Sequence, residues 1–270
     1  MTLKLSRTAF LSLIWPLLTL FLCFWLPILI WIFKSATQKE GIIFYSGSAF
    51  TNLFVNTLWI AGLTTIFSIA LAYPLALVWW TSKGKKASII SAVVFLPILV
   101  GLLARNYSWI GILSSESKYA SLGFSVIDAE SYLYSMYSVI LVMTYIFIPF
   151  AFFVLVNAFS SISHFEIDAA KTVGATTKEI LFKLILPHTY RQVSIGSFLI
   201  FANAIGYFVT PRMLGGGKQD MVGNLIWMYT NLGDFITASS ISLKFLLWFC
   251  PFYIFSFALI VLSRKKIIGR

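Results

Sequence analysis

The stretch Ser163–Pro187 reads SHFEIDAAKTVGATTKEILFKLILP and lies between long uncharged runs. It holds three of the nine acids and three of the twenty bases of the 270-residue chain. Helices that face lipid exclude charged side chains, whereas a surface that meets water or another protein accepts them. The contrast predicts membrane-spanning segments on both sides and a docking surface between them.

Two short helices joined by a tight turn are expected inside this stretch. Ser163 and Thr176 are each followed three residues later by a glutamate, which is the spacing of a capping box at a helix start. Between the two starts, Gly174 can adopt the positive φ that closes the first helix. Pro187 lacks an N–H group and is expected to end the second helix.

The second of these helices is amphipathic. Its apolar residues fall on one face and its charged residues stay outside that face. The apolar face consists of Ile180, Leu181, Leu184 and Ile185. From periodicity alone, an amphipathic connector that lies on a membrane surface explains the pattern equally well.

The order of residues here resembles the EAA loop of permease subunits of ABC importers, in which Glu-Ala-Ala precedes a Gly and a closing Ile-x-Leu-Pro. Two positions differ: Asp168 stands in place of the usual Glu and Leu184 in place of the usual Ile. The resemblance implies a coupling helix that sits in a groove of a separate ATPase subunit. The residues it assigns to ATPase coupling are Glu166, Asp168, Ala169, Ala170, Gly174, Ala175, Leu184, Leu186 and Pro187.

The composition predicts an all-α integral membrane protein. Hydrophobic residues make up 59% of the chain and charged residues 11%, and the mean hydropathy is +0.90. Crossing roughly 30 Å of hydrocarbon takes about 20 helical residues, and six uncharged segments are long enough. The six predicted spans are Ala9–Phe33, Val55–Trp80, Ala87–Ala104, Tyr134–Ser160, Val193–Thr210 and Phe245–Leu262.

The distribution of charge predicts that both termini are cytoplasmic. With that orientation, thirteen of the twenty bases lie in cytoplasmic segments and six of the nine acids lie outside, as the positive-inside rule requires. The bases are spread over four membrane-flanking segments, which excludes a nucleic-acid-binding face. The first apolar run ends at Phe33-Lys34 without a small-residue cleavage site, so we expect a retained span. Cys23 and Cys250 fall in predicted spans and indicate neither a disulfide framework nor a metal site.

Three further segments narrow the resemblance. They are Asn56-Thr57, the segment from Phe208 to Gly216, and Met221-Val222-Gly223-Asn224-Leu225-Ile226. Together they resemble PotB-type and PotH-type permeases of spermidine/putrescine importers, and the likeness covers essentially the whole chain. It divides the chain into an N-terminal span with an outer interfacial segment, residues 1–53, and a permease core, residues 54–270. From the residues alone, Asn56-Thr57 is equally well explained as interfacial helix capping.

The spans hold nothing that could energise transport. No acid or base lies in the middle of a predicted span, whereas carriers driven by ions use such residues for coupling. The chain has no nucleotide-binding signature, so ATP and Mg²⁺ are expected on the partner ATPase and no cofactor on this chain. A stand-alone channel or carrier and an integral membrane enzyme stay open as alternatives. If the chain were an enzyme, its two histidines, His164 and His188, would be the candidate essential residues.

A polyamine would need a path without a fixed counter-charge, which aromatic faces and amide or carbonyl oxygens can provide. Each candidate could instead bridge two helices. Arg105 and Arg212, near the predicted outer mouth, complicate a cationic solute. They could instead pair with acids of a binding protein, or favour an anionic solute such as a phosphonate. The candidate pathway residues are Tyr73, Asn106, Tyr107, Tyr145, Asn157, Asn203 and Tyr207.

The resemblance also implies the partners and the location. An importer of this family is expected in the bacterial cytoplasmic (inner) membrane, with a dimer of ATP-binding cassette ATPases, a second, PotC-like permease and an extracytoplasmic solute-binding protein. The solute it implies is a polyamine such as spermidine or putrescine. Phosphonates, opines or other amino-acid derivatives, and iron complexes are the alternatives.

Overall fold

The computed structural model describes residues 26–35, 48–82, 84–114 and 133–250, and nearly all of these residues are helical. The predicted all-α fold is thereby confirmed. The described residues form two compact units. The larger unit comprises residues 51–224, and the smaller one comprises residues 26–35, 48–50 and 225–250.

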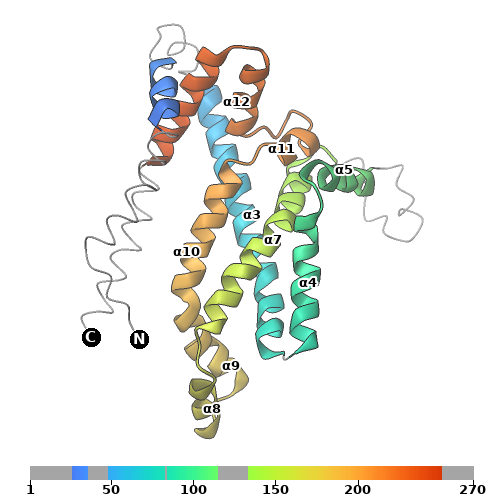
Figure 1. Ribbon diagram of the computed structural model, residues 1–270, viewed down its shortest axis with the longest axis vertical. Coiled ribbons are helices and arrows are strands. Elements are labelled where there is room, and N and C mark those ends of the chain that lie inside the picture. Colours follow the sequence, from blue (N-terminus) through green and yellow to red (C-terminus); the bar gives the residue numbers. More distant parts are fainter. Residues whose placement is uncertain (1–25, 36–47, 83, 115–132, 251–270) are drawn as a thin grey trace. The chain divides into compact units, whose positions relative to one another are not determined.

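Helix α7 (Met136–Ser160) is the core of the larger unit, and more than half of its residues are buried. Helices α10 (Leu186–Ile205), α4 (Lys85–Leu99) and α11 (Val209–Leu214) all pack against it (Figure 1). A helix that is apolar on all sides needs neighbours on all sides. The continuous hydrophobicity of residues 136–160 therefore determines its central position.

Helix α3 (Ser48–Thr81) meets α7 through small side chains. The hydroxyl of Ser68 donates a hydrogen bond to the carbonyl of Thr144 at 3.2 Å. Small residues spaced three or four apart allow two membrane helices to approach closely. The small buried residues on α3 are Thr57, Ala61, Thr64, Thr65, Ser68, Ala72 and Ala76.

A glycine allows the close approach of α10 to α7. Gly196 is buried, and a Cβ atom at this position would overlap the side chain of Val154. Valine is stiff in a helix because its χ1 has one strongly preferred rotamer, so Val154 has little freedom to move aside. The two helices therefore depend on the absence of a side chain at residue 196.

Within the residues that the structure describes, two helices have the length and hydropathy to cross a membrane, Phe50–Thr81 and Met136–Ser160. A third crossing is possible if α4 and α5 (Leu102–Leu113) count as one span, although they are bent by 97° at Val100–Gly101. The predicted straight span Ala87–Ala104 is therefore wrong at its end. The segment from Arg105 onward continues as helix α5 as far as Leu113.

Other predicted spans are shifted or only partly described. Helix α10 begins seven residues before the predicted Val193 and ends at Ile205 rather than Thr210. The helices Leu26–Ser35 and Phe235–Cys250 cover the described parts of the first and sixth predicted spans. Most of both spans, together with Cys23 and the charged termini, lies outside the described residues. Cys250 is exposed and not in a disulfide.

The smaller unit contains the helix Phe235–Cys250, which Asp234 caps by accepting a hydrogen bond from the N–H of Thr237 at 3.0 Å. Phe50 is 1% exposed and lies edge-on to Trp248, with ring centroids 6.0 Å apart. The Lys244 ammonium lies 4.5 Å from the centre of the same Phe50 ring. The start of α3 is thus held by aromatic and cation–π contacts.

Gly196→Ala should destabilise the larger unit by about 1–3 kcal/mol, the usual range for an overpacked core. Val154→Ala in the same chain should restore part of the loss by making room. Gly62→Ala is the matched control, because Gly62 is also helical and a Cβ there meets nothing within 4 Å. Thermal unfolding in detergent measures all three, and equal stability of the Gly196→Ala and Gly62→Ala chains would contradict the packing argument.

Candidate functional site

The first helix of the predicted docking stretch is α8 (His164–Thr172), and it begins and ends where expected, but Ser163 and Glu166 do not form the predicted capping box in the described structure. The Ser163 hydroxyl accepts a hydrogen bond from the N–H of Phe165 at 3.2 Å and so caps the start. At the other end Gly174 has φ +85°. Its N–H donates to the carbonyl of Lys171 at 2.9 Å, and the N–H of Ala175 donates to that of Ala170 at 3.0 Å. These two bonds close the helix with a left-handed glycine turn.

The start of the second helix is a complete capping box. In α9 (Thr177–Glu179), the N–H of Glu179 donates to the Thr176 hydroxyl at 3.3 Å, and the N–H of Thr176 donates to the Glu179 carboxylate at 3.0 Å. Lys183 donates a further hydrogen bond to this carboxylate at 2.9 Å. The Lys183 hydrogen bond, and then those from Thr176, lower the pKa of Glu179 to about 2.

The prediction that Pro187 ends the second helix is wrong. Helix α9 continues into a π-helical turn, η2 (Ile180–Ile185), and then directly into α10. The N–H of Leu186 donates to the carbonyl of Leu181, five residues back, and α10 has its proline at the first positions, where a missing N–H costs least. The wider turn thus carries the chain past the proline, and residues 177–205 are helical without a break.

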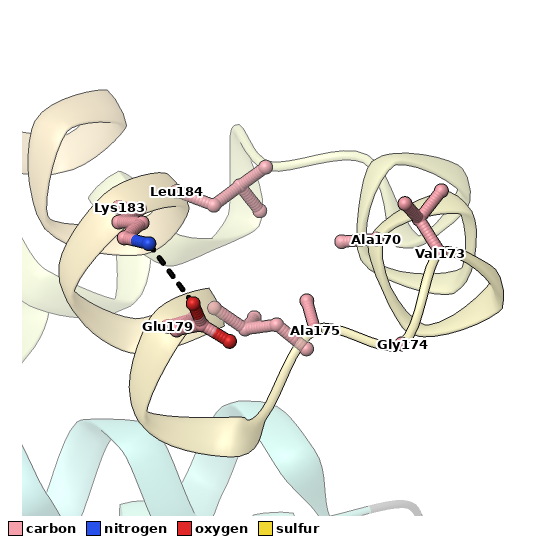
Figure 2. Close-up of a pocket in the computed structure, with 8 residues that line it drawn as sticks. Ala170, Val173, Gly174, Ala175, Glu179, Lys183 and Leu184 are labelled. Carbon is pink, nitrogen blue, oxygen red and sulfur yellow. Dashed lines mark hydrogen bonds and ion pairs between the residues drawn. The ribbon is translucent and has the colours of Figure 1, made fainter.

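A cavity of about 440 Å³ lies between α8 and η2 (Figure 2). Ala170 borders it from α8 and Leu184 from η2, while Gly174 and Ala175 form the connecting edge. These four belong to the residues that the resemblance assigns to ATPase coupling. Of the other five, Glu166, Asp168 and Ala169 are exposed on α8, and Leu186 and Pro187 are exposed at the start of α10.

Large apolar side chains stand exposed on this loop. Val173 is 90% exposed and Phe165 is 80% exposed. Charged groups lie beside them, including Asp168 and Lys171, whose side chains are 3.6 Å apart. Exposed apolar residues rimmed by polar groups are typical of a surface that contacts another protein.

Two motifs distant in sequence meet in the larger unit. The Asn56 amide donates to the carbonyl of Asp220 at 2.9 Å, and the buried Thr57 hydroxyl accepts from the N–H of Val222 at 3.0 Å. Asn56-Thr57 therefore ties α3 to the segment that leads into α12 (Val222–Asn231). Sequence reasoning missed this pairing, because nothing in either motif indicates a partner 165 residues away.

The structure disperses the candidate pathway residues. Asn106 is buried and accepts a hydrogen bond from the Thr210 hydroxyl at 2.7 Å, which joins α5 to α11. Asn157 and Asn203 are exposed and each bonds a carbonyl of its own helix. The positions of the tyrosines differ: Tyr73 packs edge-on against Phe159, Tyr107 is 65% exposed, Tyr207 packs against Phe147, and Tyr145 lines a cavity.

That second cavity has a volume of about 700 Å³ and lies between α3, α5 and α7. Trp109, Tyr137 and Thr144 line it together with Tyr145. Sequence reasoning did not select the first three. The sequence did contain a signal for Trp109. It stands four residues after Arg105, which was already considered near the predicted outer mouth, so the two residues share one helix face. Nothing local in the sequence pointed to Thr144.

Known proteins resemble the chain in sequence and in fold. The spermidine/putrescine transport system permease protein PotB of Haemophilus influenzae is 27% identical over 222 residues, which cover 74% of this chain and 76% of that protein. The molybdenum transport system permease protein ModB of Mycobacterium bovis is 27% identical over 171 residues, 61% of this chain and 62% of that one. No family model matches.

Among solved structures, a chain of a bacterial alginate ABC transporter, in complex with an alginate pentasaccharide-bound periplasmic protein, has the same fold. Its TM-score is 0.74 at 17% identity, and the match covers 91% of both chains. The resemblance to permease subunits of ABC importers, expected from the sequence, is confirmed by these relatives.

The capping box should respond to acid in a defined window. Because the pKa of Glu179 is lowered in the folded chain, the stability that its carboxylate contributes is complete above its ordinary pKa of 4.5 and is lost as the pH falls through about 2. Lys183→Met should raise this pKa towards 4.5, since it removes the strongest hydrogen bond and keeps the apolar stem. Carboxyl-carbon NMR of Glu179 measures both values. A midpoint near 4.5 in the unaltered chain would contradict the assigned contacts.

Proposed function

We propose that this chain is a permease subunit of an ATP-driven ABC importer that moves a polyamine such as spermidine or putrescine across a bacterial inner membrane. It is a transport subunit and not an enzyme. ATP and Mg²⁺ bind the partner ATPase, and the permease supplies the path.

The observation that carries the proposal is the unbroken helical link between the docking loop and the membrane core. Residues 177–205 are helical without a break through α9, η2 and α10, and α10 packs directly on α7. The capping box and the left-handed turn at Gly174 fix the connection between α8 and this helix. A displacement of α8 is therefore passed through continuous helix to α10, at its contact with α7.

The proposed assembly follows from this geometry and from the resemblance. The chain crosses the membrane six times with both termini in the cytoplasm, and α8 is the coupling helix in a groove of the ATPase. Exposed Val173 and Phe165 suit an apolar groove, and the neighbouring charges suit its rim. A second, PotC-like permease completes the path, a dimer of ATPases binds the two coupling loops, and an extracytoplasmic binding protein delivers the solute.

Transport in this assembly is alternating access. ATP binding closes the ATPase pair and brings the two coupling helices together, which opens the path outward. Hydrolysis and product release return it inward. The free energy comes from the different contacts that the ATPases make in the two states.

A second candidate keeps the importer and changes the solute to an anion such as a phosphonate or another oxyanion. Arg105 is half-buried, and its Nε has no hydrogen-bond partner within the part of the chain that the structure describes. A guanidinium in that state attracts anions and repels cations. The ModB relative carries molybdenum in its name, which adds weight to this candidate.

Gly174→Val should uncouple the transporter. A valine with φ +85° is strained by about 1–3 kcal/mol, enough to lower ATP-dependent uptake about tenfold or more by displacing α8. Gly233→Val is the matched control, because Gly233 has φ +77° and equally open surroundings but lies in the smaller unit. Asp168→Lys reverses a charge on exposed α8 and should also abolish uptake.

The measurements are uptake into proteoliposomes, ATPase activity and the amount of permease in the membrane. We expect both loop variants to stay in the membrane and to lose the link between uptake and hydrolysis. Normal uptake by Gly174→Val and Asp168→Lys would overturn the proposed coupling role. Uptake without ATP would indicate a stand-alone carrier.

A further inference from the structure

A stripe of buried residues runs from the π-helical turn η2 into α10, and its spacing changes at the turn. Ile180 and Ile185 are 8% and 5% exposed and stand five residues apart. Thr189 follows four residues later, is 1% exposed, and donates a hydrogen bond to the carbonyl of Ile185 at 2.8 Å. In an α-helix, residues five apart point about 140° away from each other, because each residue turns the helix by about 100°. A turn closed five residues back brings Ile180 and Ile185 next to each other instead.

Pro187 makes the α-helical register unfavourable at this position. In an α-helix its ring would meet the carbonyl of Lys183, four residues earlier, and that carbonyl would lack its donor. The observed turn closes one residue further back, since the N–H of Leu186 donates to the carbonyl of Leu181. The burial of Ile180 and the presence of the proline therefore favour the same register.

The register of the turn sets the direction in which the docking loop faces. The capping box at Thr176 and the glycine turn at Gly174 join α8 directly to the start of this helix. An α-helical turn made of the same residues would rotate everything before it by about one residue, or about 100°, around the axis of α10. Val173 and Phe165, which are 90% and 80% exposed, would then face another direction.

We propose that Pro187 is a positioning residue, which selects the π-helical register of Ile180–Ile185 and thereby sets the rotational position of α8 relative to α10. Its contribution to coupling lies in this register and not in a contact with the ATPase. The inference rests on the proposed importer function, and it gives a reason for a proline inside a helix that continues past it.

Removal of Phe182 tests the register, because it takes one residue out of the turn. Phe182 is 63% exposed and does not line the cavity beside α8. Without it, Ile180 and Ile185 are four residues apart, so an ordinary α-helix places both on one face. Pro187 still follows Lys183 by four residues and still opposes that α-helix. The deletion alone should lower ATP-dependent uptake about tenfold or more, the loss expected when exposed apolar anchors turn away from a partner.

Pro187→Ala in the deletion chain should restore most of the uptake, because alanine allows the α-helix that now aligns the buried residues. Pro74→Ala in the deletion chain is the matched control, since Pro74 is also exposed but lies inside the regular α-helix α3. It should restore nothing. In the chain that keeps Phe182, Pro187→Ala makes the α-helical register available and should lower uptake several-fold.

The experiment uses the complete transporter with its ATPases, second permease and binding protein, and uptake is normalised to the amount of permease in the membrane. The register is measured separately, as the distance between spin labels at Lys178→Cys and Ser194→Cys, two exposed positions on either side of the turn. The unaltered chain and the deletion chain with Pro187→Ala should give the same distance. Pro187→Ala alone should add a second distance that differs by several ångströms.

Three results would each overturn the inference. They are normal uptake by the deletion chain, equal restoration by Pro187→Ala and Pro74→Ala, and a single, unchanged label distance in the Pro187→Ala chain. The proposed importer function fails separately, if the unaltered transporter shows no ATP-dependent uptake of any solute. Uptake by the unaltered transporter without restoration by Pro187→Ala leaves that function in place and rejects the role of the register.

Discussion

The hydrogen bond from the N–H of Leu186 to the carbonyl of Leu181 is the contact on which the connection between loop and core depends. It belongs to a π-helical turn, which carries one more residue per hydrogen-bonded ring than an α-helix. Pro187 follows at once, and it would break an α-helix by removing a donor. The wide turn accommodates the proline at the start of α10, so a position that looks like a helix end lies inside a continuous helical segment. A continuous helix between a docking surface and a membrane core is a connection that a mechanically driven transporter can use.

Close packing in the larger unit relies on small side chains, because lipid offers helices no hydrophobic driving force for association. Gly196 allows α10 to reach α7, and the small residues of α3 do the same on another side of α7. Hydrogen bonds then fix the register at one end of the unit, where Thr57 meets Val222 and Asn106 meets Thr210. Bonds of this kind hold helices in a defined relation while the packed faces between them can still shift.

The docking loop and the aromatic cavity lie towards opposite ends of α7. Helix α8 follows the end of α7 at Ser160, whereas α5 lies near the beginning of α7 (Figure 1). Trp109 of α5 contacts Tyr145 of α7. A movement that enters through α8 reaches the cavity through packed helices. This arrangement suits mechanical coupling, in which repacking of α10 against α7 alters a distant cavity.

The sequence by itself determined the helical class, the long apolar helices, the capping box at Thr176 and the turn at Gly174, because hydrophobicity and capping act over a few residues. It did not determine where α4 ends, that the helix continues past Pro187, or that Asn56-Thr57 pairs with residues 220–222. Those depend on hydrogen bonds and packing between segments far apart in the chain. The cavity is the extreme case: Trp109 and Tyr145 are ordinary aromatic residues in the sequence, and only the tertiary structure places their rings 5.3 Å apart.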